Sequence, residues 1–257
     1  MMSKATFEKE TDLCAAFISK LPEEWTAYPE TGGFDILLVR KEDGFQIGVE
    51  AKLRLNAKVI NQVAEGVSTY SVTASGPDCR AVLIPYGVTT DLAGICKLLN
   101  ITVITVRKQE WDGEFQFYPY LPRTDSDWSH RDWRELCPHS RIDLPDWVPD
   151  VIAGDKAPVA LTAWKVAAIK IAITLTKRGF VTRKDFGHFD ISMSRWTQSG
   201  WIVSGNKGEW VAGSMPDFRS QHPVNYPQIE ADYEKWKSPD QERLPVQETM
   251  ELRAANG

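Results

Sequence analysis

The sequence predicts an α/β protein in which a mixed sheet is flanked by helices and is followed by a smaller α+β domain. Short apolar segments typical of buried strands recur in the first half of the chain. Segments with apolar residues at helical spacing separate several of these strands, as in sheets with helices on both faces. After residue 160, three helical segments precede two short strands around a glycine-containing turn.

The first domain is expected at residues 1–110. Its expected elements are a helix at 3–21, strands at 25–28, 34–40 and 45–52, a helix at 59–70, a strand at 79–84, a helix at 91–99 and a strand at 101–106. The first helix has an apolar stripe that includes Glu10. The turn sequence at 41–44 joins the second and third strands as a hairpin.

The rest of the chain divides by composition. Aromatic residues alternate with Pro, Asp and Arg at 111–160, which we expect to wrap over the first domain or to connect it to the next. Residues 161–215 form the second domain, with eight Lys or Arg against three acids. An acidic tail follows at 216–257. A basic domain in a chain of net charge −5 indicates a local contact with a polyanion.

Several classes of protein are not expected. No run of eighteen apolar residues occurs and the N-terminus lacks a signal-peptide pattern, so we expect a cytoplasmic protein without membrane insertion. The four cysteines are widely spaced and form no CxxC pair. A zinc site or a disulfide framework is therefore not expected.

Polar residues interrupt the predicted hairpin at three positions. If Arg40 pairs with Phe45 across the turn, Asp35 lies opposite Glu50 on the same face, with Cβ atoms about 5 Å apart. Strand alternation places Lys52 on that face too. Two carboxylates this close repel each other and desolvate poorly. A divalent cation between them would remove the repulsion.

The residue types suit Mg²⁺ or Mn²⁺, which bind one or two carboxylates and leave positions for phosphate and water. Asp35 and Glu50 would hold the ion, and Glu10 on the first helix could add a ligand. Lys52 would orient or deprotonate the attacking water, or stabilise charge in the transition state. Gln62, in the helix after this strand, could hold substrate or the lysine.

These residues resemble the motif of the PD-(D/E)xK nucleases, which have the restriction-endonuclease-like fold. The match comprises Asp35, the triplet Glu50-Ala51-Lys52, the acid Glu10 and Gln62, in an αβββαβ order over about residues 5–106. The resemblance implies metal-dependent hydrolysis of DNA, with catalytic Asp35, Glu50 and Lys52. Phe34 stands where the motif has proline, which departs from the pattern.

The second domain resembles a winged helix over about residues 161–213, because three helices precede a hairpin turned at 205–208. In that motif the third helix enters the DNA major groove and the wing touches the backbone. The residues that would contact DNA are Ser192, Ser194, Arg195, Gln198 and Lys207.

The sequence thus predicts a metal-dependent deoxyribonuclease positioned on DNA by a winged helix. A homodimer would allow one active site per chain to cut both strands. Two alternatives remain: an inactive nuclease-like scaffold acting as a DNA-binding regulator or partner-binding inhibitor, and an enzyme acting on RNA or a nucleotide. The D…ExK string is short, and Asp35 capping the glycine turn or an exposed Glu50–Lys52 pair would explain it without catalysis.

Overall fold

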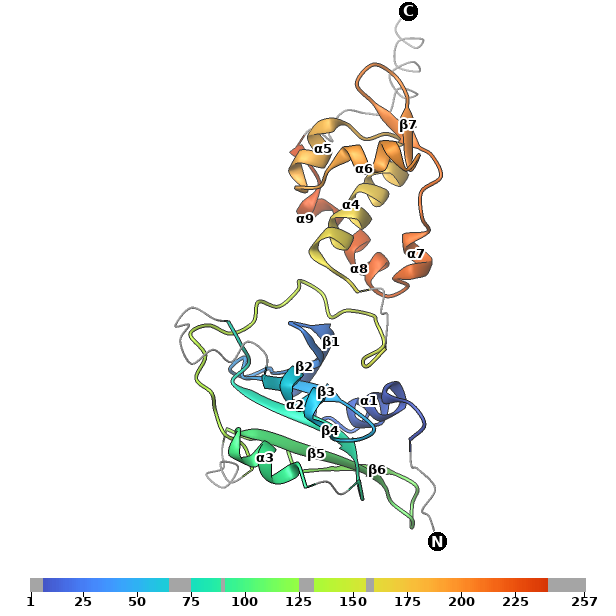
Figure 1. The fold of residues 1–257 in the computed structure, drawn as a ribbon. Helices are drawn as coiled ribbons and strands as arrows, with labels where there is room; N and C mark the ends of the chain where they lie inside the picture. Colours follow the sequence, from blue (N-terminus) through green and yellow to red (C-terminus); the bar gives the residue numbers. More distant parts are fainter. Residues whose placement is uncertain (1–6, 65–74, 89–90, 125–131, 156–159, 240–257) are drawn as a thin grey trace, which may run out of the picture. The chain divides into compact units, whose positions relative to one another are not determined.

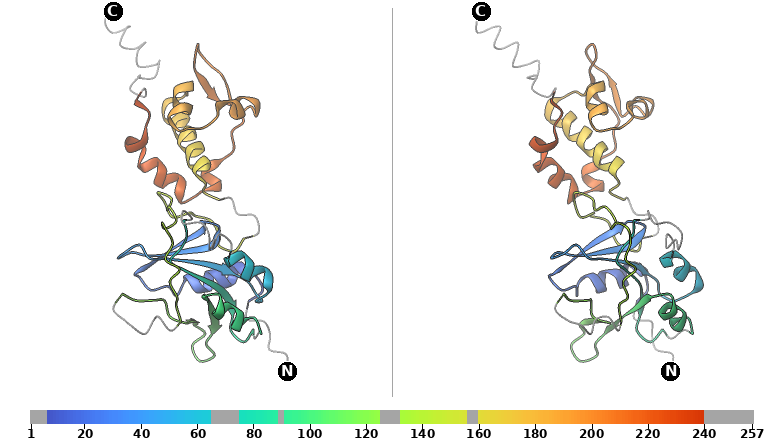
Figure 2. Two further views of the ribbon diagram at one scale, coloured as in Figure 1. Left: turned by 60° about the vertical axis from the view of Figure 1, so that its left-hand side comes forward. Right: turned by 90° about the vertical axis from the view of Figure 1, so that its left-hand side faces the viewer.

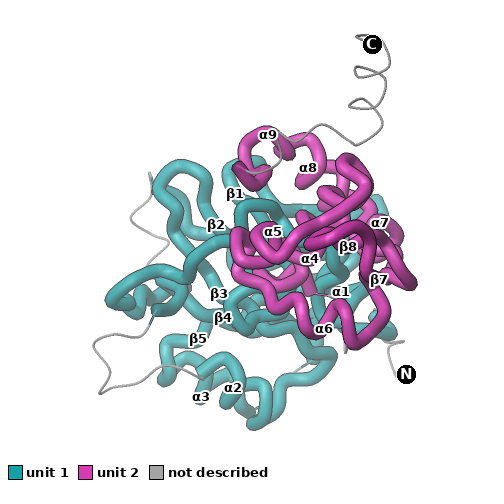
Figure 3. The backbone as a smooth tube through the Cα atoms, turned by 90° about the horizontal axis from the view of Figure 1, so that it is seen from above, with its two compact units in different colours: residues 1–158 teal, residues 159–257 magenta. Residues whose placement is uncertain are grey.

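A computed structural model of the chain describes residues 7–64, 75–88, 91–124, 132–155 and 160–239. The chain divides into two compact units, Met1–Pro158 and Val159–Gly257 (Figure 3). The aromatic segment that follows residue 110 belongs to the first unit. The segment that follows residue 215, as far as it is described, belongs to the second unit.

The first unit contains one six-stranded mixed sheet (Figure 1). Its strands are β1 Trp25–Thr31, β2 Phe34–Arg40, β3 Gln46–Ala51, β4 Cys79–Pro85, β5 Ile101–Lys108 and β6 Phe115–Tyr118, and they neighbour one another in that order. β3, β4 and β5 are parallel, whereas the other neighbours are antiparallel. The predicted mixed α/β class is confirmed, and β6 is an additional strand at the edge.

Helices cover both faces of this sheet, as predicted (Figure 2). α1 Glu10–Ile18 packs on one face, over alternate residues of the central strands such as Ile47 and Val49. α2 Ala57–Ala64 and α3 Ala93–Leu98 cover the other face, over Val82 and Ile84. Buried apolar side chains fill both layers, and their removal from water stabilises the sheet.

The first helix is shorter than predicted, and the second begins earlier than predicted, at Ala57. Residues 7–9 lie outside α1, which begins at Glu10, and Phe7 instead stacks on Phe115 of β6 with ring centroids 5.6 Å apart. Acidic residues in the first turn of α1 suit its N-terminus because they face the positive end of the helix dipole. Residues 3–6, and the end of the predicted second helix beyond residue 64, lie outside the described residues.

The predicted register of the β2–β3 hairpin is confirmed. The backbone N–H of Arg40 donates to Phe45 at 2.9 Å, and Ile36 pairs with Val49. The ring of Phe34 lies directly over Gly48, where a Cβ would come within 2.6 Å of ring carbons. Glycine at this position lets the ring close over β3.

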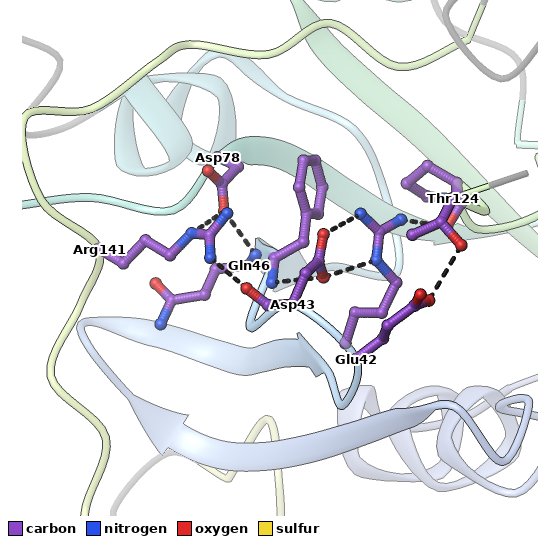
Figure 4. Close-up of polar contacts among 9 residues, drawn as sticks. Glu42, Asp43, Gln46, Asp78, Thr124 and Arg141 are labelled. Atoms are coloured by element: carbon purple, nitrogen blue, oxygen red, sulfur yellow. Dashed lines mark hydrogen bonds and ion pairs between the residues drawn. The ribbon is translucent and has the colours of Figure 1, made fainter. Parts of the chain in front are cut away.

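The aromatic segment wraps over the first unit, which is the first of the two predicted alternatives. Arg40 donates to Asp43 at 2.9 and 2.7 Å, which closes the hairpin turn. Gln46 and Ile142 exchange two hydrogen bonds of 2.8 and 2.9 Å. Arg141 donates to the backbone of Asp43 at 2.6 Å (Figure 4). These bonds hold residues 141–142 against the hairpin.

The second unit contains the predicted three helices and hairpin, followed by further helices. Its elements are α4 Ala163–Arg178, α5 Arg183–His188, α6 Met193–Gln198, β7 Ile202–Ser204, β8 Trp210–Ala212, α7 Phe218–Gln221, α8 Asn225–Ala231 and α9 Tyr233–Trp236. The helices α7, α8 and α9 lie in the segment predicted to be an acidic tail, so its described part is folded. They form because Phe218, Tyr226 and Ile229 are buried.

Local sequence fixes the first two helices of this unit. The hydroxyl of Thr162 caps α4, and Gly179 ends it with φ of 83°, a left-handed conformation that glycine adopts without strain. Asp185, which is fully buried, accepts from the N–H and hydroxyl of Thr182 at 2.7 and 2.9 Å and pairs with Arg178. This ion pair ties the end of α4 to the start of α5.

Candidate functional site

The candidate site lies where the start of β2 meets the end of β3. These two strands are antiparallel, and continuing their register by one residue places Asp35 opposite Glu50. One oxygen of the Asp35 carboxylate accepts a hydrogen bond of 2.8 Å from the backbone N–H of Ala51. This bond holds the carboxylate beside the residue that separates Glu50 from Lys52.

Glu50 is only 5% exposed, and burial is the main reason that its pKa rises to about 7. The negative charge of Asp35 raises it further, whereas Lys52 and a hydrogen bond from the backbone of Asp35 lower it. Burial also raises the pKa of Asp35, against the opposing effects of the Ala51 hydrogen bond and Lys52. The charge of Asp35 therefore destabilises the ionised form of Glu50, and the charge of Glu10 does the same to Asp35.

Lys52 contacts two acids from different elements. Its Nζ lies 2.9 Å from Oε2 of Glu10 and 3.7 Å from Oδ2 of Asp35. Burial lowers the pKa of Lys52, but the hydrogen bond to Glu10 and the charges of the surrounding acids outweigh it, so the pKa is raised. Lys52 is therefore a cation at neutral pH. As the side chains stand, Glu10 is its ion-pair partner.

Glu30 of β1 is a further acid whose charge acts on Glu50, and the D…ExK motif does not predict it. Its residue has a left-handed φ of 48°, unusual for a residue other than glycine, and its carboxylate accepts from the N–H of Gly154 at 2.8 Å. Burial and the charge of Asp35 raise its pKa. The sequence signal available was an acid just before the Gly32-Gly33 turn, which alone predicts no contact with the site.

Gln62 lies on α2, which packs on the sheet face to which Glu50 belongs. Its side-chain oxygen is buried and has no hydrogen-bond partner among the residues that the structure describes. No bond joins Gln62 to Lys52 or to the acids within the same residues. The structure therefore brings together Asp35, Glu50, Lys52 and Glu10, and leaves Gln62 apart from them.

The side chains at this site are of the chemical type that binds a hard cation, but they are not arranged around a common point. Within the described residues, no group of three or more His, Cys, Asp or Glu side chains is disposed to hold a metal. Asp35 and Glu50 provide two carboxylates at one place, which is sufficient protein ligation for Mg²⁺ when phosphate and water complete its shell. A cation would also relieve the mutual repulsion of these acids.

The five residues expected to contact DNA are all exposed in the second unit. Ser192 precedes α6, which carries Ser194, Arg195 and Gln198, and Lys207 lies in the turn between β7 and β8. The guanidinium of Arg195 lies 4.9 Å from the ring centre of Trp164. This contact orients a cation on the outer surface of α6.

No protein-family model, no curated protein and no solved structure matches this chain. Across the residues that the structure describes, no helix combines the length and apolar character needed to cross a membrane. The functional inference therefore depends on the motif and on the contacts around Asp35, Glu50 and Lys52.

Proposed function

We propose that this chain is a metal-dependent nuclease that hydrolyses DNA phosphodiester bonds, with a restriction-endonuclease-like first unit and a winged-helix second unit. The observation that carries the proposal is the convergence at the end of β3. The Nζ of Lys52 lies 3.7 Å from Oδ2 of Asp35. The same carboxylate accepts a hydrogen bond from the backbone N–H of Ala51, the residue between Glu50 and Lys52. This combination of two desolvated carboxylates and an amine matches the D…ExK pattern.

Asp35 and Glu50 would hold Mg²⁺ or Mn²⁺. When bound, such an ion lowers the pKa of water and neutralises charge on the scissile phosphate. Glu50 must lose its proton to serve as a ligand, which its pKa of about 7 permits at neutral pH. Asp35 is already positioned by the Ala51 N–H, so little reorganisation is required of it.

Lys52 would stabilise the negative charge that develops on the phosphate oxygens. Because its pKa is raised, it acts as a cation and hydrogen-bond donor, which favours this role over that of general base. Glu10 now holds the amine at 2.9 Å. In the nuclease, Glu10 would either leave Lys52 and bind the metal ion, or keep the ion pair and position the lysine.

The second unit would deliver the nuclease unit to duplex DNA. Support comes from the order of three helices and a hairpin, and from an additional β-bridge between Val181 and Trp210 that joins the hairpin to the segment after α4. Arg195 on α6 and Lys207 in the hairpin turn are exposed, as recognition-helix and wing residues must be. Cutting both strands would then take two copies of the chain.

One observation favours a second candidate, a DNA-binding regulator built on an inactive nuclease fold. Lys52 is already neutralised by Glu10, and within the described residues the acids form no ready-made set of three metal ligands. In this alternative the acidic and basic side chains form a structural ion-pair cluster. Both candidates retain binding of DNA by the second unit.

A nicking assay separates the two. Supercoiled plasmid is incubated with wild type, Lys52→Ala and Lys58→Ala, with Mg²⁺, with Mn²⁺ or with chelator. Lys58 is an exposed lysine on the nearby α2, so its removal controls for a general loss of positive charge. We expect metal-dependent nicking by wild type and Lys58→Ala, and a loss of roughly 10²- to 10³-fold in Lys52→Ala, as for removal of one donor that stabilises developing charge.

The regulator predicts that all three proteins bind the plasmid and leave it intact in every metal. Single-stranded DNA and RNA are assayed in parallel, because an RNA-directed enzyme would cut only the latter. Nicking that is equal in wild type and Lys52→Ala would show that another protein or another site is responsible.

A further inference from the structure

A cavity of about 390 Å³ opens on the sheet at β5 and β6, apart from the acids. The residues that line it are Tyr86, Thr105, Arg107, Gln116, Phe117, Tyr118 and Tyr120. Three of them are tyrosines that are 57–61% exposed. Large aromatic side chains gathered on an open surface indicate a place for a binding partner, whereas single exposed ones do not.

The polar groups of this cavity are already ordered. Arg107 lies with its guanidinium carbon 5.6 Å from the ring centre of Tyr86, and its Nη2 donates to Gln116 at 2.9 Å. Gln116 also donates to the hydroxyl of Tyr120 at 3.4 Å. The rings of Tyr118 and Tyr120 lie edge to face, with their centroids 6.5 Å apart. These contacts hold flat aromatic and guanidinium groups in a preformed arrangement.

The charge of the cavity fits an anionic ligand. Among the described residues that line it, Arg107 is the one charged residue and none is an acid. Tyrosine rings and guanidinium planes are the groups on which unstacked nucleotide bases pack. A surface that combines them with a positive charge therefore suits the bases and phosphates of an unpaired strand.

The strand register places this surface toward the same end of the sheet as Lys52. β3, β4 and β5 are parallel, and Ala51 pairs with Leu83, so the next row contains Lys52 and Ile84. Ile84 pairs with Thr105, and Thr105 pairs with Tyr118. Three strand spacings separate Lys52 from Tyr118, which is about 14 Å. That distance corresponds to a few nucleotides at the roughly 3.4 Å rise of each strand in duplex DNA.

We propose that Tyr86, Arg107, Tyr118 and Tyr120 stack unpaired bases of the DNA strand whose phosphate lies at Asp35 and Glu50. This inference rests on the proposed nuclease function and specifies its substrate: DNA with a single-stranded stretch beside the cleavage point, such as a flap, a bubble or a frayed end. The second unit would bind the adjoining duplex.

Binding without cleavage tests the proposal directly. Full-length protein carrying Lys52→Ala, without divalent metal, is titrated into a fluorescein-labelled single-stranded oligothymidine and into a duplex of the same length, with fluorescence anisotropy as the readout. Adding Tyr118→Ala or Tyr86→Ala should weaken single-strand binding by roughly 5- to 150-fold each, because stacking contributes about 1–3 kcal/mol per base. Duplex binding should change less than about twofold.

Two further variants test whether the loss of single-strand affinity depends on the aromatic rings of the cavity. Tyr118→Phe keeps the ring, so it should retain single-strand affinity. Trp111→Ala removes another exposed aromatic residue, 79% exposed, from the turn that joins β5 to β6 and outside the cavity, so it should also have no effect. Thermal unfolding of each variant checks that the fold is intact, and Tyr86→Ala serves if Tyr118→Ala does not fold. An oligouridine distinguishes RNA from DNA as the preferred strand.

Unchanged single-strand affinity in both folded alanine variants would overturn the proposal, as would an equal loss of duplex affinity. The nicking assay is independent of this result. A chain that nicks plasmid but shows no tyrosine effect retains the nuclease function and loses the stacking surface. A chain that shows the tyrosine effect but never cuts is a single-strand binder without catalysis.

Discussion

Replacing Glu50 by glutamine should stabilise the protein in the absence of metal. Folding raises the pKa of Glu50 from 4.5 to about 7, because the carboxylate is buried beside Asp35. The folded state then holds a proton more tightly than the unfolded state, so this group lowers stability as pH rises from about 4.5 through 7. Glutamine carries no charge and keeps the shape, so it removes this cost.

The magnitude follows from the size of the pKa change. At 1.36 kcal/mol per pKa unit, a rise to about 7 corresponds to at most about 3 kcal/mol above pH 7. Lys52 and Glu10 at the site are 24% and 30% exposed, so solvent screens part of the interaction, and we expect about 1–2 kcal/mol. For a unit of this size, that is a rise in melting temperature of about 2–8 °C.

Thermal unfolding of wild type and Glu50→Gln in chelator at a series of pH values measures the effect. The advantage of Glu50→Gln should be absent near pH 4 and complete above pH 7. Adding Mg²⁺ at pH 8 should raise the melting temperature of wild type and leave that of Glu50→Gln unchanged, since only the carboxylate gains from a cation. If Glu50→Gln were less stable than wild type at pH 8, the ionised carboxylate would be well solvated or paired, and burial would not destabilise it.

Three other predictions concern the packing and the DNA surface. Gly48→Ala should destabilise the first unit by about 1–3 kcal/mol because its Cβ would meet the Phe34 ring at 2.6 Å, whereas Gly94→Ala, where nothing lies within 4 Å, should not; urea unfolding measures both. Asp185→Asn should destabilise the second unit by about 3–5 kcal/mol, because it breaks the buried ion pair with Arg178. The exposed Asp190→Asn is the control, and an equal loss of stability in both variants would contradict this prediction. Arg195→Ala and Lys207→Ala should each lower the slope of log affinity for duplex DNA against log salt by about 0.9; an unchanged slope would place the DNA elsewhere.

The fold of the first unit was predictable where a short segment carries its own signal. Cys79–Pro85 is buried at every position, and the uninterrupted apolar run at 81–85 indicates a central strand without any knowledge of its neighbours. The hairpin register followed from the length of the turn between Arg40 and Phe45. Because register determines which residues face each other, the meeting of Asp35 with the end of β3 could also be predicted.

The remaining features depend on contacts distant in sequence. β6 is a four-residue edge strand that forms because Phe117 packs on Phe17 of α1, a contact across 100 positions that no local pattern reveals. The Glu30 carboxylate, whose charge raises the pKa of Glu50, is held by the N–H of Gly154 from the far end of the aromatic segment. In the last segment, the many acids obscure the spacing of buried residues such as Ile229, so its helices were not predicted.

Diffraction from crystals soaked in Mn²⁺ would locate the proposed ion itself through its anomalous signal. We expect a single strong peak within about 2.3 Å of a carboxylate oxygen of Asp35 and one of Glu50, with Lys52 beside it. The same peak should be missing in Glu50→Gln. An undisturbed Lys52–Glu10 ion pair with no manganese between Asp35 and Glu50, at concentrations that support nicking by the wild type, would contradict the proposed metal site.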